Sequence, residues 1–225
     1  MGAGLLNDVT DSALPELSEE TRQELGKEHL DEVLEKHPRT SQQNAVNRVN
    51  RLFAEMAQGG DFPHRRFTVT IVEDETVNAY SFIGHNIVMT TGFLDFAGSD
   101  DDMVFFVMAH EVGHVQLGHT ELPFRRAKAA GTLGPAGTLA HGAAEQVLRV
   151  SPMSQAQERD ADCYAVRLLR KASRPVDGAV RFFNRMDEKE RKAGTREPDD
   201  ELVGALFGSH PQSSRRIDNI RDGCK

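Results

Sequence analysis

The feature that most constrains how this chain can fold is a pair of histidines one helical turn apart in an apolar stretch. The apolar residues 103–107 lead directly into His110-Glu111-Val112-Gly113-His114, which has the form His-Glu-x-x-His. Ser99 and the acidic residues 100–102 can cap the start of a helix, and Gly118 is typical of its end. The pattern predicts a helix that is buried on nearly all sides and carries three polar side chains.

Helix geometry indicates what these side chains can do. At about 100° per residue, His110 and His114 project from one face, where two imidazoles can share one tetrahedral zinc ion. Glu111 projects beside them, as a general base in metal-assisted hydrolysis must. Three polar groups in an apolar core helix are costly unless something pairs them. We therefore interpret the motif as a zinc site rather than as two satisfied core histidines.

A catalytic zinc site needs a third protein ligand and leaves one position for water. His119 would lie on the opposite side of an unbroken helix from the first histidine, so we expect it to cap the helix or to contact a ligand. Glu158 is the better candidate, because Ser154 and Gln157 have capping-box spacing and open a separate helix there. Asp162 follows one turn later, where it can accept a proton from a ligand histidine.

The remaining pattern predicts one mainly helical α+β domain over residues 18–225, after a poorly ordered leader at 1–17. Apolar residues alternate with threonines over residues 66–72, and two short runs flank Gly84-His85-Asn86 as in a hairpin, so a small mixed or antiparallel sheet should lie beside the motif helix. Further helices are predicted over residues 18–37, 41–59, 139–150, 154–174, 176–192, 199–207 and 214–221, with a short one after residue 120.

Net charge and cysteine content indicate which binding partners and which compartment suit the chain. A formal net charge of -8 would repel nucleic acid and anionic membranes, and no apolar run approaches the roughly 20 residues that cross a bilayer. The first ten residues show no basic segment followed by an apolar one, so no secretory signal is visible. The two cysteines, Cys163 and Cys224, form either one disulfide in an oxidising compartment or two buried thiols.

Four features in order give the chain a family resemblance. They are Asn78-Ala79-Tyr80 before a hairpin strand, the His-Glu-Val-Gly-His helix, Glu158-x-x-x-Asp162, and His210-Pro211 with Arg216-Ile217 downstream. On these residues, within roughly residues 66–220, the chain resembles the gluzincin zinc endopeptidases related to the CAAX prenyl protease and HtpX. It is most similar to their compact soluble members, called minigluzincins.

The resemblance implies a ligand set and an enzyme class. It implies one Zn2+ per chain on His110, His114 and Glu158, with Glu111 as the base and Asp162 hydrogen-bonded behind the ligands. It implies an endopeptidase that hydrolyses internal bonds of unfolded or extended polypeptides. An extracytoplasmic location after removal of a signal is favoured, without excluding the cytoplasm, and the oligomeric state is not readable.

The resemblance also implies roles for residues outside the ligand set. The strand that begins with Asn78, Ala79 and Tyr80 should pair with an extended substrate backbone. His210 and Arg216 should lie near the metal, where either can stabilise an oxyanion or His210 can occupy the open zinc position at rest. The neighbouring Arg215 leaves open which arginine points inward.

Several alternatives remain open at this stage. A chaperone-like or regulatory module could hold zinc in a closed, non-catalytic site with His210 as the fourth ligand. A hydrolase of non-peptide amides, or a zymogen locked by His210, would use the same motif. Because a proteolytic activity must be gated, we also expect residues 129–142, which are rich in glycine and alanine, to act as a lid.

Overall fold

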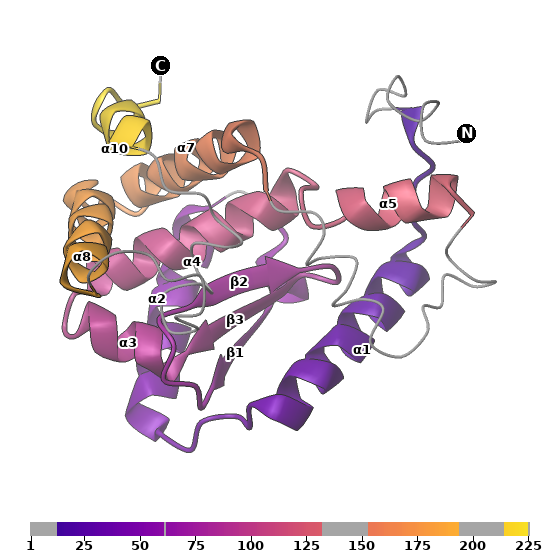
Figure 1. Ribbon diagram of the computed structural model, residues 1–225, viewed down its shortest axis with the longest axis horizontal. Coiled ribbons are helices and arrows are strands. Elements are labelled where there is room, and N and C mark those ends of the chain that lie inside the picture. The colour runs from indigo at the N-terminus through magenta and orange to yellow at the C-terminus, as the bar shows by residue number, and fades with distance from the viewer. Residues whose placement is uncertain (1–12, 61, 132–152, 194–213, 225) are drawn as a thin grey trace.

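A computed structural model describes residues 13–60, 62–131, 153–193 and 214–224 (Figure 1). These ranges are mainly helical with one three-stranded sheet, which is the predicted α+β architecture. The elements are α1 (Glu19–Lys36), α2 (Gln43–Gly59), a 3-10 turn η2 (His64–Arg66), β1 (Thr68–Val72), β2 (Ala79–Phe82), β3 (Asn86–Thr90), α3 (Thr91–Ala97), α4 (Asp101–Gln116), α5 (Leu122–Ala129), α7 (Gln155–Lys171), α8 (Asp177–Ala193) and α10 (Ser214–Arg221).

The sheet is mixed and has the order β1-β3-β2. The central strand β3 runs parallel to β1, with Thr68 opposite Asn86, and antiparallel to β2, with Ala79 opposite Met89. The predicted hairpin between β2 and β3 turns through Gly84 and His85, which have φ of 80° and 63°. Within the described ranges β2 therefore has a strand partner on one side only, and Figure 1 shows it as the strand nearest α4.

The sheet lies between two helical layers. One face contributes Ile71, Ala79 and Met89 to the main core, which is shared with α2, α4, α7 and α8. The opposite face carries Phe82 and Val88, which pack against Val33, Leu30 and Leu34 of α1 (Figure 1). Side chains alternate between the faces of a strand, so β2 presents Ala79 and Ser81 toward the α4 layer.

Helix α4 is the centre of the domain, as the sequence predicts. Every residue from Met103 to His114 is buried, and α7 lies along one side of the helix. A Cβ atom added at Gly113 would stand 3.1 Å from both the carbonyl oxygen of Ala161 and the Cβ of Tyr164. Glycine inside the motif thus permits the close approach of α7, the helix that carries Glu158.

One helix was not predicted from the sequence, and one predicted helix cap is present. Helix α3 was not predicted, because it follows the buried strand β3 with no turn between them; Thr90 ends the strand and caps the helix by accepting from the N–H of Phe93 at 3.1 Å. The predicted capping box is confirmed, with Ser154 and Gln157 each bonding to the other's backbone.

Some of the predicted elements lie wholly or partly outside the residues that the structure describes. The helices expected at 139–150 and 199–207, most of the expected lid and residues 1–12 of the expected leader lie outside the described residues. Leu14 and Leu17, later in that leader, are buried, and the Leu14 carbonyl accepts from Arg125 of α5 at 2.7 Å. Among the described helices, none combines the length and the apolar character that crossing a bilayer demands.

Candidate metal centre

The two motif histidines meet the carboxylate of Glu158 in the interior of the domain. The Nε2 atoms of His110 and His114 lie 3.0 Å apart, and each ring comes from the same face of α4. Glu158, in the first turn of α7, places its carboxylate oxygens 3.3 Å from His114 Nε2 and 3.5 Å from His110 Nε2. All three side chains are buried, and Glu158 is 0% exposed.

The spacing of these three ligand atoms fits a zinc ion. Tetrahedral zinc with bonds of about 2.0–2.1 Å separates its ligand atoms by about 3.3–3.4 Å. The two histidine nitrogens lie 3.0 Å apart, and each lies near a different oxygen of Glu158, His114 Nε2 at 3.3 Å from Oε1 and His110 Nε2 at 3.5 Å from Oε2, so these separations are close to that distance. Within the described ranges, His110, His114 and Glu158 form the one group of three potential ligands that converges in this way.

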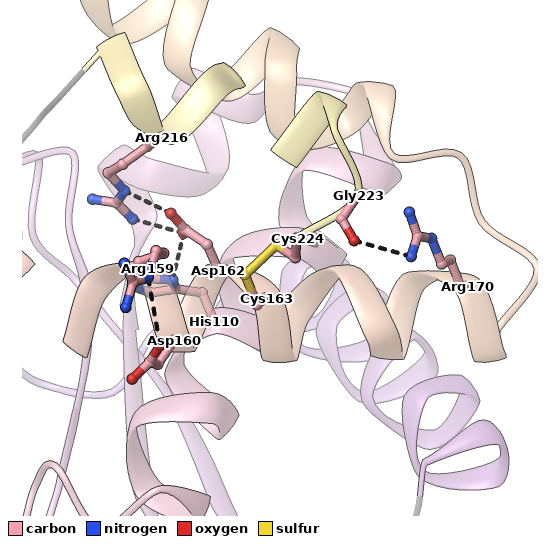
Figure 2. The surroundings of a disulfide bond; sticks show 9 residues. All are labelled: His110, Arg159, Asp160, Asp162, Cys163, Arg170, Arg216, Gly223 and Cys224. Carbon is pink, nitrogen blue, oxygen red and sulfur yellow. Dashed lines mark hydrogen bonds and ion pairs between the residues drawn. A yellow bond between two sulfur atoms is a disulfide. The ribbon is translucent and has the colours of Figure 1, made fainter. Parts of the chain in front are cut away.

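A second layer of buried charge surrounds the ligands. Asp162 has an oxygen 3.0 Å from His110 Nδ1 (Figure 2), whereas Glu158 lies near Nε2 of the same ring. Arg216 of α10 donates to both oxygens of Asp162, at 2.7 and 2.8 Å, and its Nη1 lies 2.8 Å from Glu158. The guanidinium also stacks over Phe183 of α8 at 4.8 Å. Arg216 therefore joins the ligand carboxylate to the carboxylate behind His110.

The electrostatics of this cluster favour positive charge among the ligands. Burial alone would lower the pKa of His110, but contacts with Asp162 and Glu158 outweigh it and raise the pKa to about 10. Burial raises the pKa of Asp162, whereas Arg216 and His110 overcome that effect and lower it. With both histidines neutral, as metal binding requires, the three buried carboxylates of Glu111, Glu158 and Asp162 and one buried guanidinium have a formal charge of -2, which a divalent cation would neutralise.

Glu111 is held by a residue of the neighbouring strand. The hydroxyl of Ser81, on β2, donates to Glu111 Oε2 at 2.7 Å. Glu111 is buried, whereas Ser81 is only partly buried. The strand expected to receive substrate is therefore in direct contact with the expected base. No sequence pattern indicates this contact, although strand alternation places Ser81 on the same face as Ala79.

The expected substrate segment lies at the start of β2. Asn78 precedes the strand, and its backbone bonds to Thr90 in both directions, at 3.1 Å each. The Asn78 side-chain oxygen is buried and has no hydrogen-bond partner among the residues that the structure describes. Ala79 is buried, and Tyr80 packs toward α1 on the opposite face.

The remaining candidates divide between described and undescribed parts of the chain. Arg216 is the arginine that enters the centre, with 6% of its surface exposed. Arg216 contacts the carboxylates of Asp162 and Glu158 and so holds them in position, a role that the sequence did not indicate. His210 and Pro211 lie outside the described residues. His119 Nδ1 lies 3.0 Å from His114 Nδ1, so His119 contacts one of the expected ligands, which is one of its two expected roles.

A disulfide lies immediately beside the centre. Cys163, the residue after Asp162 on α7, is bonded to Cys224, which follows α10, with Cα atoms 5.4 Å apart (Figure 2). Of the two alternatives left by the sequence, the structure thus has the disulfide. Because Arg216 lies on the same short C-terminal segment, the bond ties the helix that carries the arginine to the helix that carries its carboxylate partners.

The chain matches one protein family and several known proteins. The model of Peptidase family M48 matches residues 43–223. Metalloprotease LoiP of Escherichia coli (strain K12) is 30% identical over 157 residues, which cover 65% of this chain and 58% of LoiP. A putative beta-barrel assembly-enhancing protease of Vibrio cholerae serotype O1 is 27% identical, covering 71% of this chain and 35% of that protein.

A further relative has the same pattern of coverage. Metalloprotease YcaL of Escherichia coli (strain K12) is 26% identical over 157 residues, which cover 65% of this chain and 58% of YcaL. In each case the match spans less than two thirds of the relative's own length. The family match, by contrast, covers most of this chain and includes the whole cluster of His110, His114 and Glu158. The chain therefore belongs to peptidase family M48, as its resemblance to the gluzincins implied, and so to the metallopeptidase class of hydrolases.

Proposed function

We propose that this chain is a zinc-dependent endopeptidase that hydrolyses internal bonds of unfolded or extended polypeptides. The observation that carries the proposal is the convergence of two imidazole nitrogens and one carboxylate at zinc spacing, with a further carboxylate beside them on the same helix. His110, His114 and Glu158 would hold the ion. When bound, zinc supplies a Lewis acid that activates water near neutral pH and polarises the scissile carbonyl.

The residues of the chain then have separate tasks in the reaction. Glu111 accepts a proton from the attacking water on its carboxylate and delivers it to the nitrogen of the leaving amine. Asp162, with an oxygen 3.0 Å from His110 Nδ1, would accept the proton of that nitrogen and so keep the ring turned toward the ligand cluster. Arg216 holds Asp162 and Glu158 in place. Support of the oxyanion by His210 or Arg216 stays a prediction from the family resemblance.

The edge of β2 is the proposed docking place for substrate. An unpaired strand edge binds an extended chain through main-chain hydrogen bonds, which do not require a particular sequence. Folded proteins rarely offer such a segment, so this geometry supports the proposal of an unfolded or extended substrate.

An extracytoplasmic compartment is the proposed location. The Cys163–Cys224 disulfide would persist in an oxidising compartment and is rare in the cytosol. Two relatives, from Vibrio cholerae and Yersinia pestis, carry names that refer to beta-barrel assembly. Both considerations support a place of action outside the cytoplasm.

Metal analysis combined with a cleavage assay tests the function. Wild-type protein should hold one zinc per chain and degrade an unfolded protein such as casein. Glu111→Gln should bind zinc equally but cleave on the order of 10²–10⁴-fold more slowly, because it lacks the base. The exposed Glu24, changed to Gln, is the matched control. Zinc binding without cleavage by the wild type would favour a closed, non-catalytic site, and undiminished cleavage by Glu111→Gln would remove the proposed base.

A further inference from the structure

We infer, on the basis of the proposed zinc site, that His119 is a positioning residue that fixes the ring of His114 for metal binding. It does for this ligand what Asp162 does for His110. The two ligand rings have matching surroundings: each directs Nε2 into the cluster, and each has a second side chain at Nδ1. For His114 that second side chain is His119, whose Nδ1 lies 3.0 Å from His114 Nδ1.

The identity of the donor follows from the chemistry of imidazole. A neutral ring has one N–H and one bare nitrogen, and the bare nitrogen is the one that binds a metal. If His114 binds through Nε2, its proton is on Nδ1, so Nδ1–H donates and His119 Nδ1 accepts. His119 then carries its own proton on Nε2. This pairing selects the tautomer of His114 that presents a lone pair to the ligand cluster.

The end of α4 explains why His119 reaches back to His114. Gly118 adopts a positive φ of 74°, and the chain forms a Schellman motif there. The N–H of Gly118 bonds to the carbonyl of Val115 at 3.1 Å, and the N–H of His119 bonds to the carbonyl of His114 at 2.9 Å. The helix therefore does not continue to residue 119, and the turn places both backbone and ring of His119 against the ligand.

A neutral acceptor suits the charge of the centre. Three buried carboxylates already face one buried guanidinium, so a fourth carboxylate behind His114 would add a negative charge that the divalent ion could not balance. His119 supplies the acceptor without that charge. His119 is not itself a zinc ligand in this arrangement, because within the described ranges the converging group comprises His110, His114 and Glu158 alone.

Substitution of His119 tests the assignment through metal affinity rather than through activity. His119→Phe keeps an aromatic ring but removes the acceptor, and should weaken zinc binding on the order of 10–100-fold in competition with a chromogenic chelator. His119→Asn, whose side-chain oxygen can take the place of Nδ1, should recover most of that affinity. His37→Phe, at a partly exposed position at the end of α1, is the control and should bind zinc like the wild type.

The zinc affinities of these variants decide whether His119 has this role. Unchanged zinc affinity in His119→Phe would overturn the assignment, and so would an equal loss in His119→Phe and His119→Asn, since the hydrogen bond would then be irrelevant. Thermal unfolding of the metal-free variants shows whether folding has been affected. If His119→Phe does not fold, recovery of affinity by His119→Asn still supports the assignment and its failure refutes it. None of these results depends on peptide cleavage, so the proposed function stands or falls separately through Glu111→Gln.

Discussion

At the scale of single residues, the centre depends on contacts that hold reactive groups in one orientation. In the proposed reaction the carboxylate of Glu111 must be turned toward a water molecule beside His110, His114 and Glu158, yet a glutamate side chain can rotate about several bonds. Ser81 restricts that freedom by donating to Oε2 from β2. A hydrogen bond to a charged group contributes about 1.5–3 kcal/mol, which is enough to select one orientation.

Removal of this hydroxyl should therefore slow the chemical step. Ser81→Ala is expected to lower kcat by about 10-fold, since about 1.4 kcal/mol corresponds to a factor of ten in rate. KM and zinc content should change little, because the hydrogen bond of the serine hydroxyl is to Glu111 and to none of the three proposed ligands. Steady-state kinetics on an unfolded or peptide substrate measures both constants, and Ser81→Thr, which keeps a hydroxyl, is the control. A rise in KM at constant kcat would instead assign Ser81 to substrate binding.

At the scale of elements, the centre is a junction of three helices. Helix α4 supplies both histidines, α7 supplies Glu158 and Asp162, and α10 supplies Arg216. The first two helices pack through the close approach at Gly113. The third is a short helix, and its attachments include Ile220 in the core, Arg216 in the cluster and the disulfide to α7. The position of α10 therefore depends more on a few individual contacts than the position of α7 does.

Opening the disulfide should loosen α10 and weaken the metal site. Cys224→Ser removes a cross-link over 61 residues, which should lower the free energy of unfolding by about 2–4 kcal/mol. Because Arg216 then holds Asp162 and Glu158 less firmly, zinc affinity should fall as well. Chemical denaturation and chelator competition measure the two effects.

The matched controls separate the disulfide from other effects of reduction. A phosphine, which is oxidised to its oxide as the disulfide becomes two thiols, should reproduce the loss in the wild type and have no further effect on Cys224→Ser. If the disulfide acts through the arginine, the affinity losses of Cys224→Ser and Arg216→Lys should be less than additive in the double variant. Full additivity would show that the two act independently.

At the scale of the whole molecule, partly buried arginines join the helices at the end of α4 opposite the metal centre. Arg174 donates to Glu55 of α2 at 2.7 Å and to Asp102 of α4 at 2.6 Å, and it stacks over Phe105. Arg181 of α8 donates to Asp100, the residue that caps α4. Hydrogen bonds from these arginines lower the pKa of Glu55 and of Asp100.

These lowered values predict a loss of stability in acid. A carboxyl whose folded pKa lies below its unfolded value of about 4 stabilises the fold above that pH, and the contribution disappears as pH falls through the folded pKa. Arg174→Leu should cost about 1 kcal/mol at pH 7, because Glu55 is partly exposed and water screens the pair. It should also flatten the dependence on pH below 4. Urea unfolding at several pH values measures both, and an unchanged acid slope would contradict the prediction.

Much of the fold and part of the centre could be predicted because the signals are local. A capping box, the helical spacing of His110 and His114 and the turn at Gly84 each depend on residues within a few positions. Glu158 was found in the same way, by its place one turn from Asp162 on a capped helix. The resemblance to the gluzincins, which the match to family M48 bears out, rests on ordered motifs of the same local kind.

Tertiary structure alone decided the contacts that complete the centre. The parallel pairing of β1 with β3, the hydrogen bond from Ser81 to Glu111 and the ion pair of Arg216 with Asp162 join positions far apart, the latter two separated by 30 and 54 residues. No periodicity encodes such pairs, because they depend on how whole helices and strands pack. The sequence by itself determined which side chains α4 offers to a metal; packing decided what holds them there, since hydrogen bonds and ion pairs need atoms within about 3 Å and only the assembled fold brings distant residues so close.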